Sequence, residues 1–203
     1  MRSLYKNIIG VLTVNTIIII LSIGVIVLSI VCLPRILPSK KIKKFITGIA
    51  NGIGDIVVWT MKISLIPLHR PKWIIEFPEG ISKKSWYLGT SNHMSWADIF
   101  VLLFSARHPA TAFSFAEGTR FSDTKKVAMK SDYKNLLNPK IGALATALAG
   151  MPMVSELIDF TLIYETDKRS AWAFACGEMK NVKIIVKKYK IPIYTKKILI
   201  VGS

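Results

Sequence analysis

The stretch Ser91-Asn92-His93-Met94-Ser95-Trp96-Ala97-Asp98 marks a change in the pattern of the chain. An apolar segment, residues 86–90, comes before it, and an apolar run, residues 99–104, follows it. This pattern predicts a strand, a tight turn and the start of a helix. In an open α/β sheet, such a junction lies at the edge where ligands usually bind.

His93 and Asp98 are the residues of this stretch that can carry chemistry. In a regular helix, five residues turn through about 500°, so the two side chains would not share a face. They can meet only if His93 lies in the turn before the helix and Asp98 lies in its first turn. Two interpretations stay open. Ser95 and Asp98 form the pattern of a capping box, whereas a histidine oriented by an aspartate is typical of a general base.

The composition limits the kinds of partner that this chain of 203 residues can have. Hydrophobic residues make up 51%, and 28 Lys and Arg against 12 Asp and Glu leave a formal net charge of +16. The mean hydropathy is +0.42. A basic and apolar chain favours an anionic bilayer surface over nucleic acid. We expect Cys32 and Cys176 to be small apolar residues, and the scattered histidines to form no metal site.

The N-terminal run, residues 8–33, has no charged side chain. As a helix it would be about 39 Å long, beyond the roughly 30 Å of a bilayer core. Residues 1–38 are therefore predicted to be an uncleaved transmembrane anchor. Basic residues are in excess on the C-terminal side of the run, and this places the rest of the chain in the cytoplasm. They are Arg35, Lys40, Lys41, Lys43 and Lys44.

A second apolar segment follows the anchor. Residues 45–66 carry apolar side chains at helical spacing, with Asp55 in the middle. A charge at mid-membrane is costly, so we predict that residues 39–70 form an amphipathic helix associated with the membrane. A second transmembrane span is the less favoured alternative.

A second polar block, Phe115-Ala116-Glu117-Gly118-Thr119-Arg120, ends the strand predicted for residues 110–115. It is either a surface turn or a phosphate site. In a phosphate site, Arg120 would offer a bidentate donor, Thr119 a hydroxyl and Gly118 an accessible backbone N–H. Glu117 would orient Arg120 or accept a hydrogen bond from a substrate hydroxyl.

The remaining pattern predicts a mixed α/β fold. Further strands are expected at residues 73–77, 158–164 and 182–193. A charged loop is expected at residues 122–134, and a helix that begins at Asn138-Pro139 and runs through Leu148.

The two polar blocks together resemble the 1-acylglycerol-3-phosphate (lysophosphatidate) acyltransferase family, which is marked by an NHxxxxD block followed by an F-x-EGTR block. Residues 136–143 and 174–180 look like the branch that contains a bacterial inner-membrane acyltransferase. The resemblance implies a glycerolipid-acyltransferase-like mixed sheet flanked by helices, behind an N-terminal transmembrane helix. It also implies a place in the bacterial inner membrane, with the catalytic part on the cytoplasmic side.

The resemblance further implies a mechanism in phospholipid biosynthesis or remodelling. His93, oriented by Asp98, would act as general base on the free hydroxyl of a lysophospholipid. That hydroxyl would attack the thioester of acyl-CoA or of acyl-carrier protein, with no metal and no bound cofactor. The acceptor would be held by Ser95, Glu117, Gly118, Thr119 and Arg120.

The sequence also departs from the family. His93 and Glu117 lie closer together than usual, which indicates a deletion near residues 104–108 of an acyltransferase domain at residues 71–193. Residues 194–203 form an unmatched tail, so the C-terminus is expected to be shortened and the α/β layer incomplete. A second hypothesis is therefore a catalytically impaired family member that only binds the membrane and anionic lipids.

Overall fold

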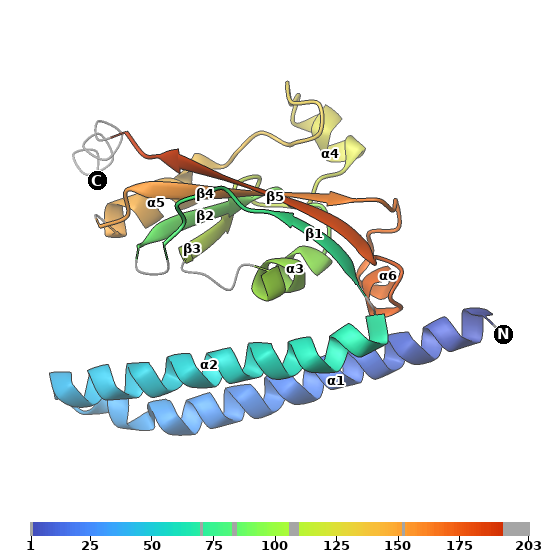
Figure 1. Ribbon diagram of the computed structural model, residues 1–203. Helices are drawn as coiled ribbons and strands as arrows, with labels where there is room; N and C mark the ends of the chain where they lie inside the picture. The colour runs from blue at the N-terminus through green and yellow to red at the C-terminus, as the bar shows by residue number, and fades with distance from the viewer. Residues whose placement is uncertain (1, 70, 83–84, 106–109, 152, 193–203) are drawn as a thin grey trace. The chain divides into compact units, whose positions relative to one another are not determined.

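The computed structural model describes residues 2–69, 71–82, 85–105, 110–151 and 153–192 (Figure 1). The chain divides into two compact units. One contains Met1–Pro71 and Ala171–Lys180, and the other contains Lys72–Ser170 and Asn181–Ser203.

The first unit is built on two long helices. α1 (Arg2–Cys32) is followed by a short 3₁₀ turn, η1 (Leu33–Ile36), and then by α2 (Lys40–His69). The Thr13 hydroxyl of α1 is hydrogen-bonded to Nε2 of His69, the last residue of α2, at 2.9 Å. The two helices therefore run antiparallel, with the start of α1 beside the end of α2.

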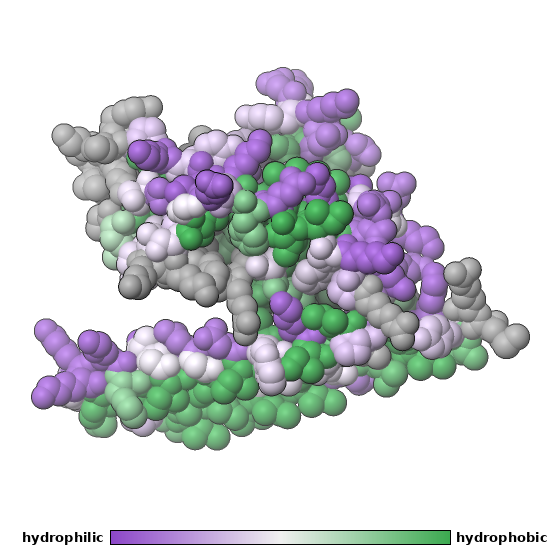
Figure 2. Space-filling view, in the orientation of Figure 1, coloured by the Kyte–Doolittle hydropathy of each residue, from purple (hydrophilic) through white to green (hydrophobic). Residues whose placement is uncertain are grey.

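Both long helices have the length and composition of membrane helices. The apolar segments Ser3–Ile36 and Lys40–Pro67 are each long and apolar enough to cross a membrane. Apolar side chains gather along one long side of the helix pair in Figure 2. The helix predicted for residues 39–70 is thus present, and a second span fits its length and composition as well as an amphipathic surface helix does.

Of the two segments that resemble the inner-membrane branch, residues 174–180 pack on the N-terminal part of α1. α6 (Ala171–Ala175) and the residue after it lie close to α1, since a Cβ on Gly10 would come within 3.0 Å of the Trp172 ring and 2.8 Å of the Cys176 sulfur. Cys176 is buried and is a free thiol. Glu178 accepts a hydrogen bond from the Lys6 ammonium at 2.6 Å. Residues 171–180 therefore belong with the helix pair.

The second unit is a five-stranded sheet with the strand order β1-β5-β4-β2-β3. The bounds are close to the predicted ones: β1 (Lys72–Glu76), β2 (Tyr87–Ser91), β3 (Ala110–Phe115), β4 (Glu156–Tyr164) and β5 (Asn181–Lys190). β4 and β5 pair antiparallel, and the other neighbours pair parallel. The prediction of a mixed sheet flanked by helices is confirmed.

One face of the sheet is apolar and carries the helix α3 (Ala97–Ser105). On β4 its members are Phe160, Leu162 and Tyr164, which alternate with less buried residues. The ring of Phe104 on α3 stacks on that of Trp73 on β1, with centroids 6.1 Å apart.

The opposite face mixes polar and apolar side chains. Asp159, Thr161 and Lys183 point to it, and Ile163 and Tyr189 are about half exposed there. This face of the sheet is therefore apolar only in part.

Two predicted boundaries are wrong. The segment predicted as a charged loop contains a helix, α4 (Asp123–Ala128), because the Ser122 hydroxyl caps it by accepting from the Lys125 N–H. α5 (Ile141–Gly150) begins later than Asn138, whose side-chain amide donates instead to the Met129 carbonyl at 3.1 Å. Of the predicted deletion near residues 104–108, positions 106–108 lie outside the described residues, as does the tail at residues 194–203.

Candidate functional site

The site is built where three parallel strands end at the same edge. β2, β3 and β4 run in one direction, with Ser91 paired to Phe115 on one side and to Phe160 on the other. Asn92 follows β2, and its side chain continues the ladder. Its amide nitrogen donates to the Leu162 carbonyl at 2.9 Å, and its oxygen accepts from the Leu162 N–H at 2.8 Å. This bidentate pairing sets where the main chain turns away from the sheet.

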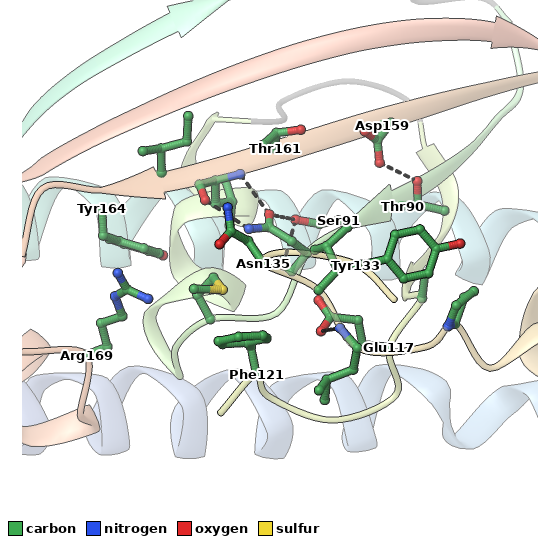
Figure 3. Close-up of a pocket in the computed structure, with 18 residues that line it drawn as sticks. Thr90, Ser91, Glu117, Phe121, Tyr133, Asn135, Asp159, Thr161, Tyr164 and Arg169 are labelled. Atoms are coloured by element: carbon green, nitrogen blue, oxygen red, sulfur yellow. Dashed lines mark hydrogen bonds between the residues drawn. The ribbon is translucent and has the colours of Figure 1, made fainter. Parts of the chain in front are cut away.

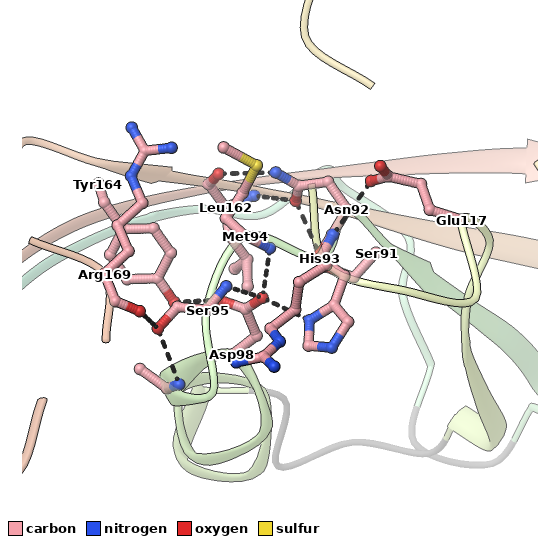
Figure 4. A network of polar contacts seen from close by, with 12 residues as sticks. Ser91, Asn92, His93, Met94, Ser95, Asp98, Glu117, Leu162, Tyr164 and Arg169 are labelled. Atoms are coloured by element: carbon pink, nitrogen blue, oxygen red, sulfur yellow. Dashed lines mark hydrogen bonds and ion pairs between the residues drawn. The ribbon is translucent and has the colours of Figure 1, made fainter. Parts of the chain in front are cut away.

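His93 lies in that turn and Asp98 in the first turn of α3, as the spacing required. Nδ1 of His93 is 2.9 Å from Oδ2 of Asp98 (Figure 4). An ionised carboxylate only accepts hydrogen bonds, so Nδ1 carries the proton and Nε2 carries the lone pair. Among the described residues, none forms a hydrogen bond with Nε2 of His93. The two side chains therefore meet in the one way that their spacing allows.

Asp98 also caps its helix. The same Oδ2 accepts from the backbone N–H groups of Met94 at 2.7 Å and Ser95 at 2.9 Å. The capping box and the histidine–aspartate pair are therefore not alternatives, because one buried carboxylate oxygen serves both. Its exposure is 0%, so each donor replaces water that the charge has lost.

Tyr164 completes the shell around Asp98, and the sequence did not single it out. Its hydroxyl donates to Oδ1 of Asp98 at 2.5 Å. Burial raises the pKa of Tyr164 far above its usual range, and the negative charge of Asp98 and this hydrogen bond raise it further. The phenol therefore stays protonated. The sequence could have pointed to Tyr164 by its position, since it is the last residue of a predicted strand whose alternate residues are apolar.

Glu117 does not make the contact with Arg120 that was one of its two predicted roles, and its contact with a substrate hydroxyl stays a prediction. It is 3% exposed, and its oxygens accept from the backbone N–H of His93 at 3.2 Å and of Leu137 at 2.8 Å. Both oxygens bind the main chain, so the side chain does not orient Arg120, although Glu117 also lines the cavity described below. Glu117 instead joins the His93 turn to the segment before α5.

The other three residues of the Glu117–Arg120 turn are less buried than Glu117. Gly118 has the positive φ that was expected, 63°, but its N–H donates to the Phe115 carbonyl at 2.9 Å and is not free for a phosphate. The Thr119 hydroxyl accepts from the Lys125 ammonium at 2.7 Å. Arg120 is exposed, and its guanidinium lies 4.7 Å from the centre of the Trp96 ring. Of the three predicted phosphate donors, Arg120 is the one that is charged and exposed to solvent.

Two contacts bring this turn to the histidine. The Phe121 N–H donates to the His93 carbonyl at 2.8 Å. The Phe115 ring stacks on the imidazole, with centroids 4.1 Å apart and an interplanar angle of 17°. The two polar blocks of the sequence therefore form one site.

Ser95 is fully buried. Its hydroxyl donates to the Arg169 carbonyl at 2.8 Å and accepts from the Ala97 N–H at 3.1 Å. These contacts fasten the segment after β4 to the start of α3. The predicted contact between Ser95 and an acyl acceptor stays a prediction.

A cavity of about 710 Å³ adjoins the His93 turn through Asn92 and Met94 (Figure 3). Most of its wall is apolar, and Arg169, which the sequence did not single out, lines one part of it. Within the part of the chain that the structure describes, no three His, Cys, Asp or Glu side chains form a group that suits a metal ion. The chemistry that the described side chains offer is that of a base, an anion-binding guanidinium and an apolar cavity.

Comparisons with known proteins support the fold. The sequence matches no protein-family model and no curated protein. The structure is similar to the crystal structure of the 1-acyl-sn-glycerophosphate (LPA) acyltransferase PlsC from Thermotoga maritima, with a TM-score of 0.53 and 14% sequence identity. The match covers 100% of this chain and 97% of that chain. The predicted glycerolipid-acyltransferase-like fold, behind an N-terminal apolar helix, is confirmed.

Proposed function

We propose that this chain is an O-acyltransferase. It would move a fatty acyl group from acyl-CoA or acyl-carrier protein to the free hydroxyl of a lysophospholipid such as 1-acylglycerol-3-phosphate. The observation that carries the proposal is the 2.9 Å contact between Nδ1 of His93 and Asp98, which leaves the lone pair of Nε2 for a substrate. The fold shared with a lysophosphatidate acyltransferase supports it.

In the proposed reaction, Nε2 of His93 takes the proton of the acceptor hydroxyl as its oxygen attacks the thioester carbonyl. Asp98 stabilises the imidazolium that forms. The tetrahedral intermediate collapses, the carbon–sulfur bond breaks, and the leaving thiolate takes the proton from His93. The products are an ester and a free thiol, and His93 is neutral again. The acyl group passes directly to the acceptor, without an enzyme ester.

Arg120 is the residue that we assign to the phosphate of the acceptor. Its guanidinium is exposed, and the contact with Trp96 keeps it close to the His93 turn. A guanidinium binds phosphate through two parallel N–H donors, which would hold the acceptor in one orientation. The acceptor would thus be an anionic lipid with a free hydroxyl, and the net charge of +16 favours such a partner.

We further propose that the helix pair α1–α2 holds the chain in a bacterial inner membrane, with the site on the cytoplasmic side. Acyl-CoA and acyl-carrier protein are cytoplasmic donors, and the basic residues 35–44 were the sequence signal for that side. The length and apolar composition of both helices support membrane association.

The test uses the purified full chain in detergent micelles. It is mixed with acyl-CoA or acyl-carrier protein and with 1-acylglycerol-3-phosphate, and the diacyl product is measured by mass spectrometry. A monoacylglycerol without phosphate is the matched acceptor, and His93→Ala is the matched enzyme. We expect product from the native chain with the phosphorylated acceptor, and none from His93→Ala.

One result would reject the proposed activity, and another would reject only the role of Arg120. Absence of product with both donors, together with tight binding to anionic vesicles, would favour the lipid-binding protein without activity. Equal rates with and without the acceptor phosphate would remove the role assigned to Arg120.

A further inference from the structure

The two carboxylate oxygens of Asp98 accept hydrogen bonds from two different parts of the chain. Oδ2 accepts from groups of its own turn, the side chain of His93 and the N–H groups of Met94 and Ser95. Oδ1 accepts from Tyr164, which lies 66 residues away in the sequence, at the end of β4. A capping box needs only the first set. The second oxygen is aligned by a residue that the cap does not require.

We propose that Tyr164 is a positioning residue of the catalytic pair, and that its hydroxyl sets how strongly Asp98 holds the proton on His93. The inference rests on the proposed function, in which His93 acts as the base. Tyr164 itself touches no substrate in this scheme. It acts through Asp98, to which it donates at 2.5 Å in a site where the carboxylate is fully buried.

The direction of the effect follows from charge. A phenol that donates to Oδ1 withdraws part of the negative charge of Asp98 from the imidazole. Without that hydrogen bond, the carboxylate attracts the imidazolium more strongly, so His93 keeps its proton to a higher pH. A general base works only when it is neutral. Loss of the hydroxyl therefore moves the acidic limb of the pH–rate profile to higher pH.

The other charged groups of the site do not reverse the expected direction of the pH shift. Glu117 binds the His93 N–H through its carboxylate, away from Oδ1. Arg169 is near enough to Tyr164 to oppose the rise of the Tyr164 pKa, and its main chain is fastened by Ser95. Tyr164→Phe removes the phenol hydroxyl and leaves the charges of Glu117 and Arg169 in the chain. The variant therefore tests the hydrogen bond to Asp98 alone.

The chain offers a matched control. Tyr87 is fully buried at the start of β2, and its hydroxyl accepts from the Ser82 N–H at 2.9 Å. Tyr87→Phe thus removes one buried, hydrogen-bonded hydroxyl from a neighbouring strand, at the other end of β2 from His93. If Tyr164 were only a structural residue, the two variants would lose melting temperature and would both keep the native pH profile.

The experiment measures kcat/KM for acyl transfer against pH in both variants. For Tyr164→Phe we expect the acidic limb to move up by about half a pH unit. The lost hydrogen bond changes the charge on Asp98, and only part of that change reaches the His93 imidazole. We expect kcat to fall by at most about threefold near neutral pH, because half a pH unit lowers the neutral fraction of the base by no more than that, with little change in KM for the acceptor. Tyr87→Phe is expected to keep the native profile. Coincident profiles for Tyr164→Phe and the native chain would overturn the proposal.

A second measurement decides the question without turnover. NMR titration of histidine-labelled protein follows the His93 ring, assigned by its loss in His93→Gln. We expect its midpoint to move to higher pH in Tyr164→Phe and to stay in Tyr87→Phe. An unmoved midpoint would overturn the role of Tyr164. Absence of acyl transfer by the native chain would overturn the proposed function alone, since the titration is read in the same samples.

Discussion

The His93–Asp98 turn and the Glu117–Arg120 turn end neighbouring strands, but they are held in opposite ways. Asp98 is fully buried and accepts four hydrogen bonds from four residues. Arg120 is exposed and has one ring contact, at 4.7 Å from Trp96. The difference shows which side chains of the site have a fixed position. The group that orients the base is immobilised, whereas the group assigned to the acceptor is left in solvent.

Burial explains the contrast. A buried carboxylate loses its water, so every lost partner costs about 1–3 kcal/mol and the site must be complete. An exposed guanidinium keeps its water, and its stacking on an aromatic ring is worth only about 0.5–1 kcal/mol. Glu117 shows that burial decides this behaviour, since it belongs to the second turn yet has the fixed, backbone-bound character of the first.

The largest effect is expected from His93→Gln, which removes the base and keeps an amide of similar length. Acyl transfer should fall about 10³-fold, within the range that general-base catalysis supplies. The melting temperature should fall by only about 2–4 °C, because the Gln amide can donate to Asp98 in place of the ring and the main loss is the stacking on Phe115. Rates are compared with unfolding curves of the same preparations. A variant that kept a tenth of native activity would contradict the role of His93.

The next effect is on stability. Asp98→Ala leaves the Met94 and Ser95 N–H groups and the Tyr164 hydroxyl without their acceptor, so we expect a loss of about 3 kcal/mol in the free energy of unfolding. Asp159→Ala is the control, because among the described residues that carboxylate accepts one hydrogen bond, from Thr90, and it is only half-buried. About 1 kcal/mol is expected there. Denaturant unfolding in detergent gives both values, and equal losses would break the comparison between buried and exposed groups.

Glu117→Gln tests which turn Glu117 belongs to. An amide keeps one acceptor oxygen but turns an NH₂ toward one of two backbone donors, those of His93 and Leu137, so a loss of about 2 kcal/mol in stability is expected. KM for 1-acylglycerol-3-phosphate should change less than about twofold, because no contact with the acceptor is lost. A large rise in KM with unchanged stability would restore the sequence-based role of Glu117 as an acceptor ligand.

The smallest effects are expected around Arg120. Arg120→Ala should raise KM for 1-acylglycerol-3-phosphate about tenfold, equivalent to about 1.4 kcal/mol, and should leave kcat and the unfolding curve nearly unchanged. Trp96→Ala should raise KM about threefold and Trp96→Phe less, because a smaller ring keeps part of the stacking. Lys134→Ala removes an exposed charge of the same sign and is expected to leave KM unchanged. An equal rise in KM for Lys134→Ala would mean that general attraction acts in place of a specific contact.

Much of the fold followed from local patterns. Apolar runs between polar turns located all the strands near their observed bounds, and the apolar N-terminal run predicted α1. The helix boundaries near Ser122 and Asn138 were predicted less well. The Ser122 hydroxyl caps α4, whereas the Asn138 amide donates to the Met129 carbonyl, and a sequence does not show which of these contacts a side chain makes.

By itself the sequence determined which residue types were available for chemistry and the local geometry of the His93 turn. A histidine and an aspartate that lie five positions apart at the start of a helix can meet in one way, and the capping preference of the turn enforces it. The conformational freedom of Gly118 was likewise a local property.

Only the tertiary structure decided how the polar groups are shared. Tyr164 and Arg169 reach Asp98 and Ser95 across 66 and 74 residues of sequence, because β4 pairs beside β2 and brings its end to the same edge. The same closeness binds Glu117 to the main chain and leaves Arg120 in solvent. Side-chain type is written in the chain, but burial and partners arise only when distant strands pack, and they determine which charge is fixed and which is free to bind.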